Sequence, residues 1–219
     1  MMTSFLRFPR GLYGITPEWD DTGRLLTAIE QAAKGGMVAL QWRRKTVHAD
    51  DALIQARQVQ QHCQKLNVLF IVNDDWRLAT MIGADGVHLG RDDDSVAQAR
   101  VALGDEKLIG CSCYDDPELA RQAITAGADY IAFGSIYPSS VKPDAVRASL
   151  DIIRSGRQLA NTLSDTDDRR VAVVAIGGIN PDNAAPVISA GADSIALISG
   201  LFDAPDIQAA ATRCQALFN

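Results

Sequence analysis

Residues 127–134 read Gly-Ala-Asp-Tyr-Ile-Ala-Phe-Gly (GADYIAFG), and the opening triplet of this stretch returns at residues 83–85 and 191–193. Each copy follows a helical pattern and precedes a short apolar run, and Gly35-Gly36 occupies a similar place in an earlier unit. Glycine suits the left-handed residue that ends a helix, and aspartate suits the turn into the next strand. Gly-Ala-Asp is also a common helix stop in general. Its recurrence before every second predicted strand favours a closed barrel over an open sheet.

Eight short runs rich in Val, Ile and Leu are predicted to be strands. Most of them do not alternate between apolar and polar residues, which is typical of parallel strands that are buried on both faces. They are residues 12–16, 37–43, 68–73, 86–89, 108–113, 130–134, 171–177 and 194–199. Helical patterns between them include residues 24–34, 51–66, 95–103, 117–126, 148–163 and 182–190. This alternation predicts a (β/α)8 barrel, with a doubly wound sheet as the alternative.

The chain shows no Pro- or Ser-rich linker that would divide it. The polar stretch at residues 161–170 (NTLSDTDDRR) is interpreted as a loop that extends a helix-to-strand joint. A length of 219 residues is the usual size of one such barrel. The sequence therefore predicts an α/β fold in which residues 1–219 form one single-domain TIM barrel.

Composition and charge exclude several classes of protein. With 47% apolar and 22% charged residues, the chain is not a disordered tail, a collagen-like fibre or a coiled coil. The excess of 27 acidic over 21 basic residues argues against binding to nucleic acid or anionic membranes. We expect no signal peptide and no membrane span, hence a cytoplasmic protein, with a homo-oligomer left open. The four cysteines and three histidines lack the spacing of a zinc site or a disulfide framework.

The second predicted strand ends on a cationic stretch. In a barrel of this kind, the functional residues lie at the carboxyl ends of the strands. Alternation along this strand places one set of side chains toward the lumen, namely Met37, Ala39, Gln41, Arg43 and Lys45. The opposite set, expected to face the helices, is Val38, Leu40 and Trp42. Two cations and an amide at one mouth predict a phosphate or diphosphate clamp, and the alternative is a solvated basic loop.

Carboxylates follow the third and fourth predicted strands. Asn73-Asp74 ends the third strand, and Asp93 comes shortly after the fourth. Mg²⁺ is usually bound by one or two carboxylates together with substrate phosphates, so Asp74 and Asp93 are the candidate metal ligands. One aspartate among residues 92–94 is expected to cap the following helix instead, and Asp94 is best placed for that.

A second anion site is predicted at the ends of the last two strands. Gly177-Gly178 and Ile198-Ser199-Gly200 match the position where barrels commonly hold a phosphate with backbone N–H groups. The loop at residues 134–143 supplies hydroxyls and one cation, which suits a mobile lid. Two anion sites imply two phosphorylated substrates or one long one.

Taken together and in order, these segments resemble the thiamine phosphate synthase family. The resemblance runs from Leu12 to Ser199 and rests on residues 41–45 (QWRRK), Asn73-Asp74, residues 86–90 (GVHLG) with Asp93, residues 109–112 (IGCS), residues 134–142 and residues 176–179 (IGGI). Each motif is weak alone, and six of them in order are specific. Members of this family are (β/α)8 barrels that join hydroxymethylpyrimidine diphosphate to hydroxyethylthiazole phosphate, which forms thiamine phosphate and diphosphate.

The resemblance also implies a role for each matching residue. The pyrimidine diphosphate would be held by Gln41, Arg43, Lys45 and Asn73, and Ser112 would touch its pyrimidine or its diphosphate. Mg²⁺ would be bound by Asp74 and Asp93. The residues that would lie at the thiazole and diphosphate side are Ser139, Val141 and Lys142. The residues that would receive the thiazole phosphate are Gly178, Ile198 and Ser199. The residues implied to act in catalysis are Arg43, Lys45, Ser112 and Lys142.

The chain departs from the family pattern at three places. The family usually has Gln where this chain has Arg91, and an acidic residue where it has Arg44. Its loop usually reads Thr-x-Thr-Lys, whereas residues 139–142 read Ser-Ser-Val-Lys, so Val141 loses a hydroxyl. One hydrogen bond to a charged group is worth about 1.5–3 kcal/mol, which predicts lower affinity rather than inactivity.

Two other functions are weighed against synthesis of thiamine phosphate. Related thiazole tautomerases share the barrel and carry a catalytic His shortly after the serine of the fifth strand, where this chain has Tyr114. A catalytically silent barrel that binds a phosphorylated metabolite is the other alternative. It would have no use for the metal pair, which this chain retains as Asp74 and Asp93.

Overall fold

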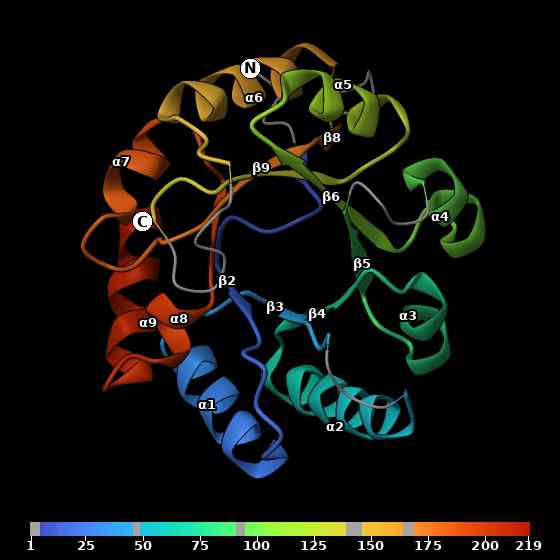
Figure 1. Ribbon diagram of the computed structural model, residues 1–219, viewed down its shortest axis with the longest axis vertical. Helices are drawn as coiled ribbons and strands as arrows, with labels where there is room; N and C mark the ends of the chain where they lie inside the picture. Colours follow the sequence, from blue (N-terminus) through green and yellow to red (C-terminus); the bar gives the residue numbers. More distant parts are fainter. Residues whose placement is uncertain (1–4, 46–48, 91–94, 139–145, 164–168) are drawn as a thin grey trace.

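The computed structural model describes residues 5–45, 49–90, 95–138, 146–163 and 169–219. Eight parallel strands close into a barrel in the order β10-β2-β3-β4-β5-β6-β7-β9, and helices surround it (Figure 1). The predicted closed α/β barrel is therefore confirmed, and the doubly wound alternative is wrong. Closure leaves no unpaired strand edge, and it brings the carboxyl ends of all eight strands to one mouth.

The barrel strands overlap the eight predicted strands, with bounds that differ by two residues or fewer. They are β2 (Gly11–Ile15), β3 (Ala39–Trp42), β4 (Leu69–Asn73), β5 (Gly86–Leu89), β6 (Leu108–Tyr114), β7 (Tyr130–Phe133), β9 (Ala172–Ile176) and β10 (Ser194–Leu197). Outside the barrel, β1 (Phe5–Leu6) pairs in parallel with β8 (Arg169–Arg170). The interpretation of residues 161–170 as a loop is thus wrong at both ends. Residues 161–163 belong to α6, and residues 169–170 form β8.

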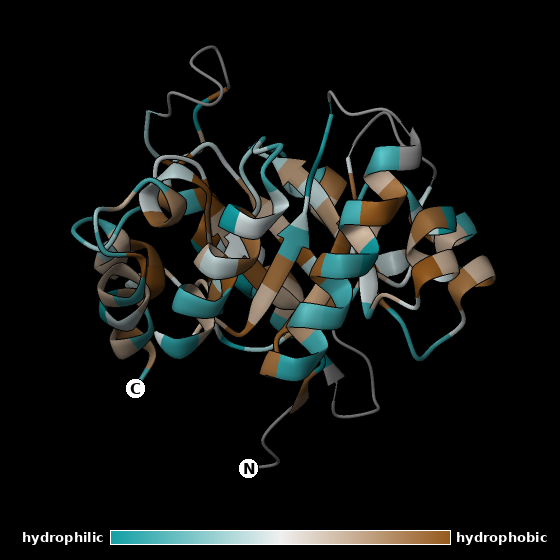
Figure 2. Ribbon diagram, turned by 90° about the horizontal axis from the view of Figure 1, so that it is seen from below, coloured by the Kyte–Doolittle hydropathy of each residue, from teal (hydrophilic) through white to brown (hydrophobic). Residues whose placement is uncertain are grey.

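Helices cover the outside of the barrel. Figure 2 shows both hydrophobic and hydrophilic residues along them, as expected for helices that bury one face. They are α1 (Thr22–Lys34), α2 (Ala49–Leu66), α3 (Trp76–Ile82), α4 (Val96–Leu103), α5 (Pro117–Thr125), α6 (Leu150–Leu163), α7 (Ala184–Ser189), α8 (Ser199–Phe202), α9 (Ile207–Gln215) and the 3₁₀ turn η1 (Ala216–Phe218). Ser95 caps α4 through a capping box with Gln98, so the expectation that Asp94 caps it is wrong. Within the described residues, no helix is long and apolar enough to cross a membrane.

The Gly-Ala-Asp triplets fasten neighbouring strands at the amino ends of the barrel. The carboxylates of Asp85, Asp129 and Asp193 accept hydrogen bonds from backbone N–H groups of the strand before their own. The donors are Phe70 N at 2.8 Å, Ile109 N at 2.8 Å and Val173 N at 2.9 Å. The glycine of each triplet has a positive φ of 70° to 116°, which a residue with a side chain rarely adopts. The repeat therefore joins consecutive strands as well as ending helices.

Two apolar clusters form the core, one between strands and helices and one inside the barrel. The inner cluster includes Phe8, Tyr13, Ile15, Ala39, Ile71, Leu108, Tyr130, Ala132, Ala172, Val174 and Ala196. Met37 belongs to the outer cluster and Val38 contacts the inner one, opposite to their predicted faces. The alternation begins only at Ala39, where β3 begins.

Candidate active site

The predicted clamp lies at the end of β3. Gln41 is buried inside the barrel, whereas the Trp42 indole points outward and donates to Gln55 Oε1 of α2 at 3.2 Å. Arg43 N donates to Thr16 Oγ1 at 2.9 Å, and this hydroxyl donates back to Arg43 O at 3.2 Å. The side chain of Arg43 is only 17% exposed. Since this segment is held by buried partners, the alternative of a solvated basic loop is wrong for Gln41 and Arg43.

Lys45 and Asp74 meet between the ends of β3 and β4. Lys45 Nζ lies 3.5 Å from Asp74 Oδ2, and both side chains are partly exposed. Asp74 has a left-handed φ of 65°, and its N–H donates to His88 O of β5 at 2.8 Å. A non-glycine residue in this conformation stores backbone strain, and such strain gathers at functional sites. The cation and the carboxylate thus face each other at the mouth.

Asp74 could contribute one carboxylate to a Mg²⁺ site. This ion is usually held by one or two carboxylates while phosphates and water complete its shell, so a dedicated cage is not needed. Within the described residues, no group of three or more His, Cys, Asp or Glu side chains could hold a metal ion. Asp93, the second predicted ligand, lies outside the described residues.

A chain of hydrogen bonds crosses the barrel beneath the mouth. Gln41 Nε2 lies 2.9 Å from Tyr13 OH, which lies 3.0 Å from Tyr130 OH. Tyr130 OH lies 3.1 Å from His88 Nδ1, and His88 Nε2 lies 2.8 Å from Ser112 Oγ. We refer to these five residues as the lumen chain. Burial raises the pKa of both tyrosines above the usual value, which keeps their hydroxyls protonated.

Sequence reasoning found the two ends of the lumen chain, Gln41 and Ser112, and missed its middle. Tyr13 and Tyr130 lie 117 residues apart and belong to different predicted strands. The available signal was a tyrosine at a buried strand position, since a buried hydroxyl needs a partner.

The glycine-rich ends of β9 and β10 come together on the other side of the mouth. Gly178 has a φ of 62°, and a Cβ there would lie 2.3 Å from Pro138 O. A Cβ on Gly200, the second residue of α8, would lie 2.2 Å from Ile179 O. Asn183 Nδ2 donates to Gly178 O at 2.9 Å. The predicted set of Gly178, Ile198 and Ser199 thus belongs to two strand ends in direct backbone contact.

Part of the predicted site lies outside the described residues. These residues are Arg91, Asp93, Ser139, Val141 and Lys142. The two flanks of the predicted lid contact each other, since Ser135 N donates to Val146 O at 3.1 Å and Ala148 N donates to Ser135 O at 2.9 Å. Asn73 ends β4 with His88 as its register partner, which brings it to the same mouth.

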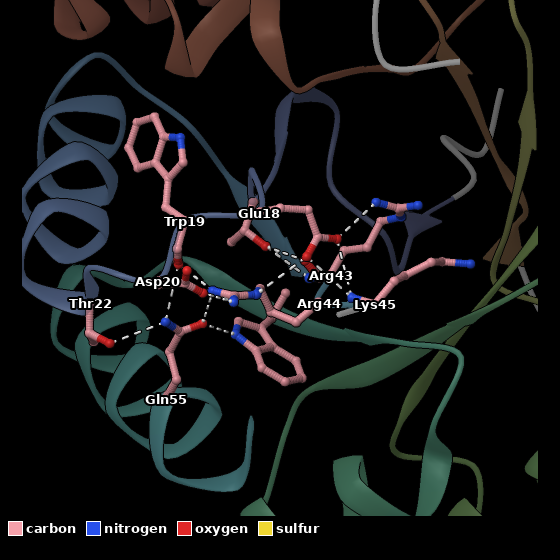
Figure 3. Close-up of polar contacts among 10 residues, drawn as sticks. Glu18, Trp19, Asp20, Thr22, Arg43, Arg44, Lys45 and Gln55 are labelled. Atoms are coloured by element: carbon pink, nitrogen blue, oxygen red, sulfur yellow. Dashed lines mark hydrogen bonds and ion pairs between the residues drawn. The ribbon is translucent and has the colours of Figure 1, made fainter. Parts of the chain in front are cut away.

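Arg44, which departs from the family pattern, turns away from the mouth (Figure 3). Its side chain is 1% exposed and lies among polar groups of the β2–α1 loop and of α2. Arg44 Nη2 lies 2.6 Å from Asp20 Oδ1, Nε lies 3.4 Å from Glu18 Oε2, and Nη1 donates to Gln55 Oε1 at 3.2 Å. Arg44 Nη1 also donates to the carbonyl of Trp19. We call Arg44 with these four partners the Arg44 clasp.

The clasp also touches the cationic stretch. Glu18 Oε1 accepts from Lys45 N at 3.1 Å and lies 3.4 Å from Arg43 Nη1 (Figure 3). Gln55 Nε2 donates to Thr22 Oγ1 at the start of α1 at 3.1 Å. The clasp therefore ties the β2–α1 loop, the end of β3 and α2 into one unit beside the predicted clamp.

Arg44→Glu is expected to lower the melting temperature by about 10 °C. The new carboxylate would be buried beside Glu18 and Asp20, and an uncompensated buried charge costs about 3–5 kcal/mol. Arg213→Glu is the matched control, because Arg213 forms an exposed ion pair with Asp182 at 2.6 Å and exposed pairs contribute little. Adding Asp20→Lys to Arg44→Glu should restore part of the loss. Equal losses for the two single variants, measured by calorimetry, would contradict a buried clasp.

Comparisons with known proteins agree with this geometry. A family model described as thiamine monophosphate synthase matches residues 12–201. The thiamine-phosphate synthase of Bordetella avium is 54% identical over 213 residues, 97% of each chain. That of Thiobacillus denitrificans is 50% identical over 212 residues, 96% of each chain. The solved structure of thiamine phosphate pyrophosphorylase from Pyrococcus furiosus superposes with a TM-score of 0.79 at 31% identity and covers 95% of each chain.

The agreement extends over nearly the whole length of this chain and of its relatives, and it includes both the barrel and the segments that form the mouth. The chain therefore belongs to the thiamine monophosphate synthase family.

Proposed function

We propose that this protein joins 4-amino-5-hydroxymethyl-2-methylpyrimidine diphosphate to hydroxyethylthiazole phosphate and so forms thiamine phosphate and diphosphate. Besides family membership, one observation carries this proposal. Lys45 Nζ and Asp74 Oδ2 lie 3.5 Å apart at the mouth, beside the partly buried Arg43. A carboxylate placed among cations suits a diphosphate that arrives with a divalent metal ion, and a phosphate alone would not need it.

The cationic side of the mouth would receive the pyrimidine diphosphate. Arg43 offers a planar fork that can bind two phosphate oxygens at once, and Lys45 offers a mobile point charge. Asn73 and Ser112 add neutral donors at the neighbouring strand ends. We assign the pyrimidine ring to Gln41, the innermost polar side chain of β3.

Asp74 and Asp93 are the residues that we propose to hold Mg²⁺. The ion would supply positive charge that neutralises the leaving diphosphate. Lys142 is proposed to act on the same diphosphate, together with Arg43, Lys45 and Ser112.

The glycine-lined side of the mouth would receive the thiazole phosphate. Gly178, Ile198 and Ser199 are proposed to bind it with backbone N–H groups, and Ser139 and Val141 to lie beside it. The carbon–oxygen bond between the pyrimidine methylene and the diphosphate breaks, and its electron pair leaves with the diphosphate. The thiazole nitrogen then donates its lone pair to the same methylene carbon. No proton is transferred in this exchange, so neither a protein nucleophile nor a general base is needed.

The direct test is an assay of the purified protein with both substrates and Mg²⁺. We expect stoichiometric release of diphosphate and formation of thiamine phosphate, followed by mass spectrometry. Omission of either substrate is the control and should abolish both products. Conversion of one thiazole phosphate isomer into another without coupling would show a tautomerase instead. Binding of the phosphates without any reaction would show a catalytically silent barrel.

A further inference from the structure

The positions of the protons in the lumen chain follow from its first member. Gln41 directs an amide N–H to Tyr13, so the Tyr13 oxygen accepts at this contact. Tyr13 is 1% exposed, and its own hydroxyl hydrogen has Tyr130 OH as its acceptor within the described structure. A buried hydroxyl that donates to nothing is costly, so Tyr13 donates to Tyr130. By the same reasoning Tyr130, which is fully buried, donates to His88 Nδ1.

This direction determines the tautomer of His88. A neutral imidazole accepts at one ring nitrogen and donates at the other. Because Nδ1 accepts from Tyr130, the proton of His88 lies on Nε2 and is donated to Ser112 Oγ. The hydroxyl hydrogen of Ser112 is then directed away from His88. Ser112 is left as a donor for an anion at the mouth.

We propose that Tyr13, Tyr130 and His88 are positioning residues that transmit the orientation of the Gln41 amide to the Ser112 hydroxyl. The inference rests on the proposed function in taking Gln41 and Ser112 as substrate contacts. If the Gln41 amide turned over, its oxygen would accept from Tyr13 and every bond of the chain would reverse. Ser112 would then donate to His88 and lose its donor for the diphosphate. The chain thus couples recognition of the pyrimidine ring to binding of the diphosphate.

Packing holds the aromatic rings of the lumen chain in place independently of their hydroxyls. The Phe8 ring lies 5.0 Å from the Tyr13 ring and 4.1 Å from the Tyr130 ring, between centroids. The rings of His88 and Tyr130 are stacked at 5.5 Å. Gly110 leaves the space that Tyr130 fills, because a Cβ there would lie 1.9 Å from Tyr130 Cζ. Tyr130→Phe should therefore break the chain and preserve the fold.

The first test needs no activity. Nitrogen-15 NMR of the full-length protein labelled at histidine reports the tautomer, and loss of one signal in His88→Gln assigns it. We expect His88 to carry its proton on Nε2 and to accept a hydrogen bond at Nδ1, and we expect Tyr130→Phe to shift the Nδ1 signal to that of a nitrogen without this bond. A proton on Nδ1 in the unaltered protein, or an Nδ1 signal that does not change in Tyr130→Phe, would overturn the proposal.

The second test asks whether Tyr130 acts through Ser112. We expect Tyr130→Phe alone to lower kcat about five- to tenfold. When Ser112→Ala is already present, Tyr130→Phe should lower kcat less than twofold, because the hydroxyl that the chain orients is then absent. Ser194→Ala is the matched control: it removes a fully buried hydroxyl that donates to Pro9 O at the opposite end of the barrel, and kcat should not change. Equal losses in both backgrounds would mean that Tyr130 is merely structural. Absence of coupling activity in the unaltered protein would instead contradict the proposed function. The NMR measurement of the His88 tautomer would still test the hydrogen-bond directions in the lumen chain.

Discussion

We expect Asp74→Asn to lower kcat/KM for coupling by about a hundredfold and to raise the Mg²⁺ concentration needed for half-maximal rate. Asparagine has nearly the same shape and tolerates the left-handed φ of 65°. It removes the negative charge that we propose to attract Mg²⁺ and leaves Lys45 Nζ without its carboxylate partner. A hundredfold loss corresponds to about 3 kcal/mol of transition-state stabilisation. The measurement is the initial rate of diphosphate release across a Mg²⁺ titration.

The neighbouring aspartate offers a matched control. Asp75 caps α3 by accepting from Leu78 N at 2.9 Å, and asparagine caps a helix about equally well. Asp75→Asn therefore changes the same charge one residue away and should keep both the rate and its Mg²⁺ dependence. If Asp74→Asn behaved in the same way as Asp75→Asn, Asp74 would not be a ligand. A uniform loss of rate with an unchanged Mg²⁺ requirement would also contradict that role.

Gly178→Ala is expected to raise KM for the thiazole phosphate by about thirtyfold or more and to leave KM for the pyrimidine diphosphate within about threefold. The new Cβ would lie 2.3 Å from Pro138 O and 2.8 Å from Tyr137 Cβ, so the backbone has to move. A backbone N–H that binds a phosphate oxygen contributes about 1.5–3 kcal/mol, and the proposed contact is lost if the N–H of Gly178 moves away from the phosphate. Steady-state kinetics with each substrate varied in turn measures both values.

Gly83→Ala is a control that separates the effect of backbone strain from a change in the glycine-lined side of the mouth. Gly83 has a φ of 70°, close to that of Gly178, and a Cβ there would meet nothing within 4 Å. The control variant thus carries a similar left-handed penalty of about 1 kcal/mol at the end of α3. It should lower the melting temperature by a few degrees and leave both KM values unchanged. A rise in KM for the pyrimidine diphosphate in Gly178→Ala would contradict the proposal that this side of the mouth binds the thiazole phosphate.

Local patterns predicted most of the barrel. The apolar runs placed every barrel strand within two residues, because a strand that is buried on both faces leaves little room for polar residues. The prediction failed where a boundary depends on a turn or a cap. Met37 and Val38 lie on the faces opposite to those predicted because β3 begins only at Ala39. Ser95, rather than Asp94, caps α4 because the capping box includes Gln98.

The candidate site was predicted in part. The placement of Gln41, Arg43 and Lys45 at the end of one strand could be predicted because alternation along a single strand is a local property, and their roles stay predictions. The Arg44 clasp could not be predicted, because Glu18 and Gln55 reach Arg44 from two other elements. The same holds for Asp129 of the second Gly-Ala-Asp triplet, whose carboxylate binds Ile109 N in the preceding strand.

By itself, the sequence determined the order of strands and helices, the closed barrel that this order favours, and which strand ends carry charge, because each depends on spacing along the chain. Tertiary structure alone decided which side chains meet across the lumen. Tyr13 reaches Tyr130 over 117 residues and His88 reaches Ser112 over 24, through bonds that no local pattern encodes. Only closure of the barrel turns these strand faces toward one another, and burial then requires each polar group to find a partner.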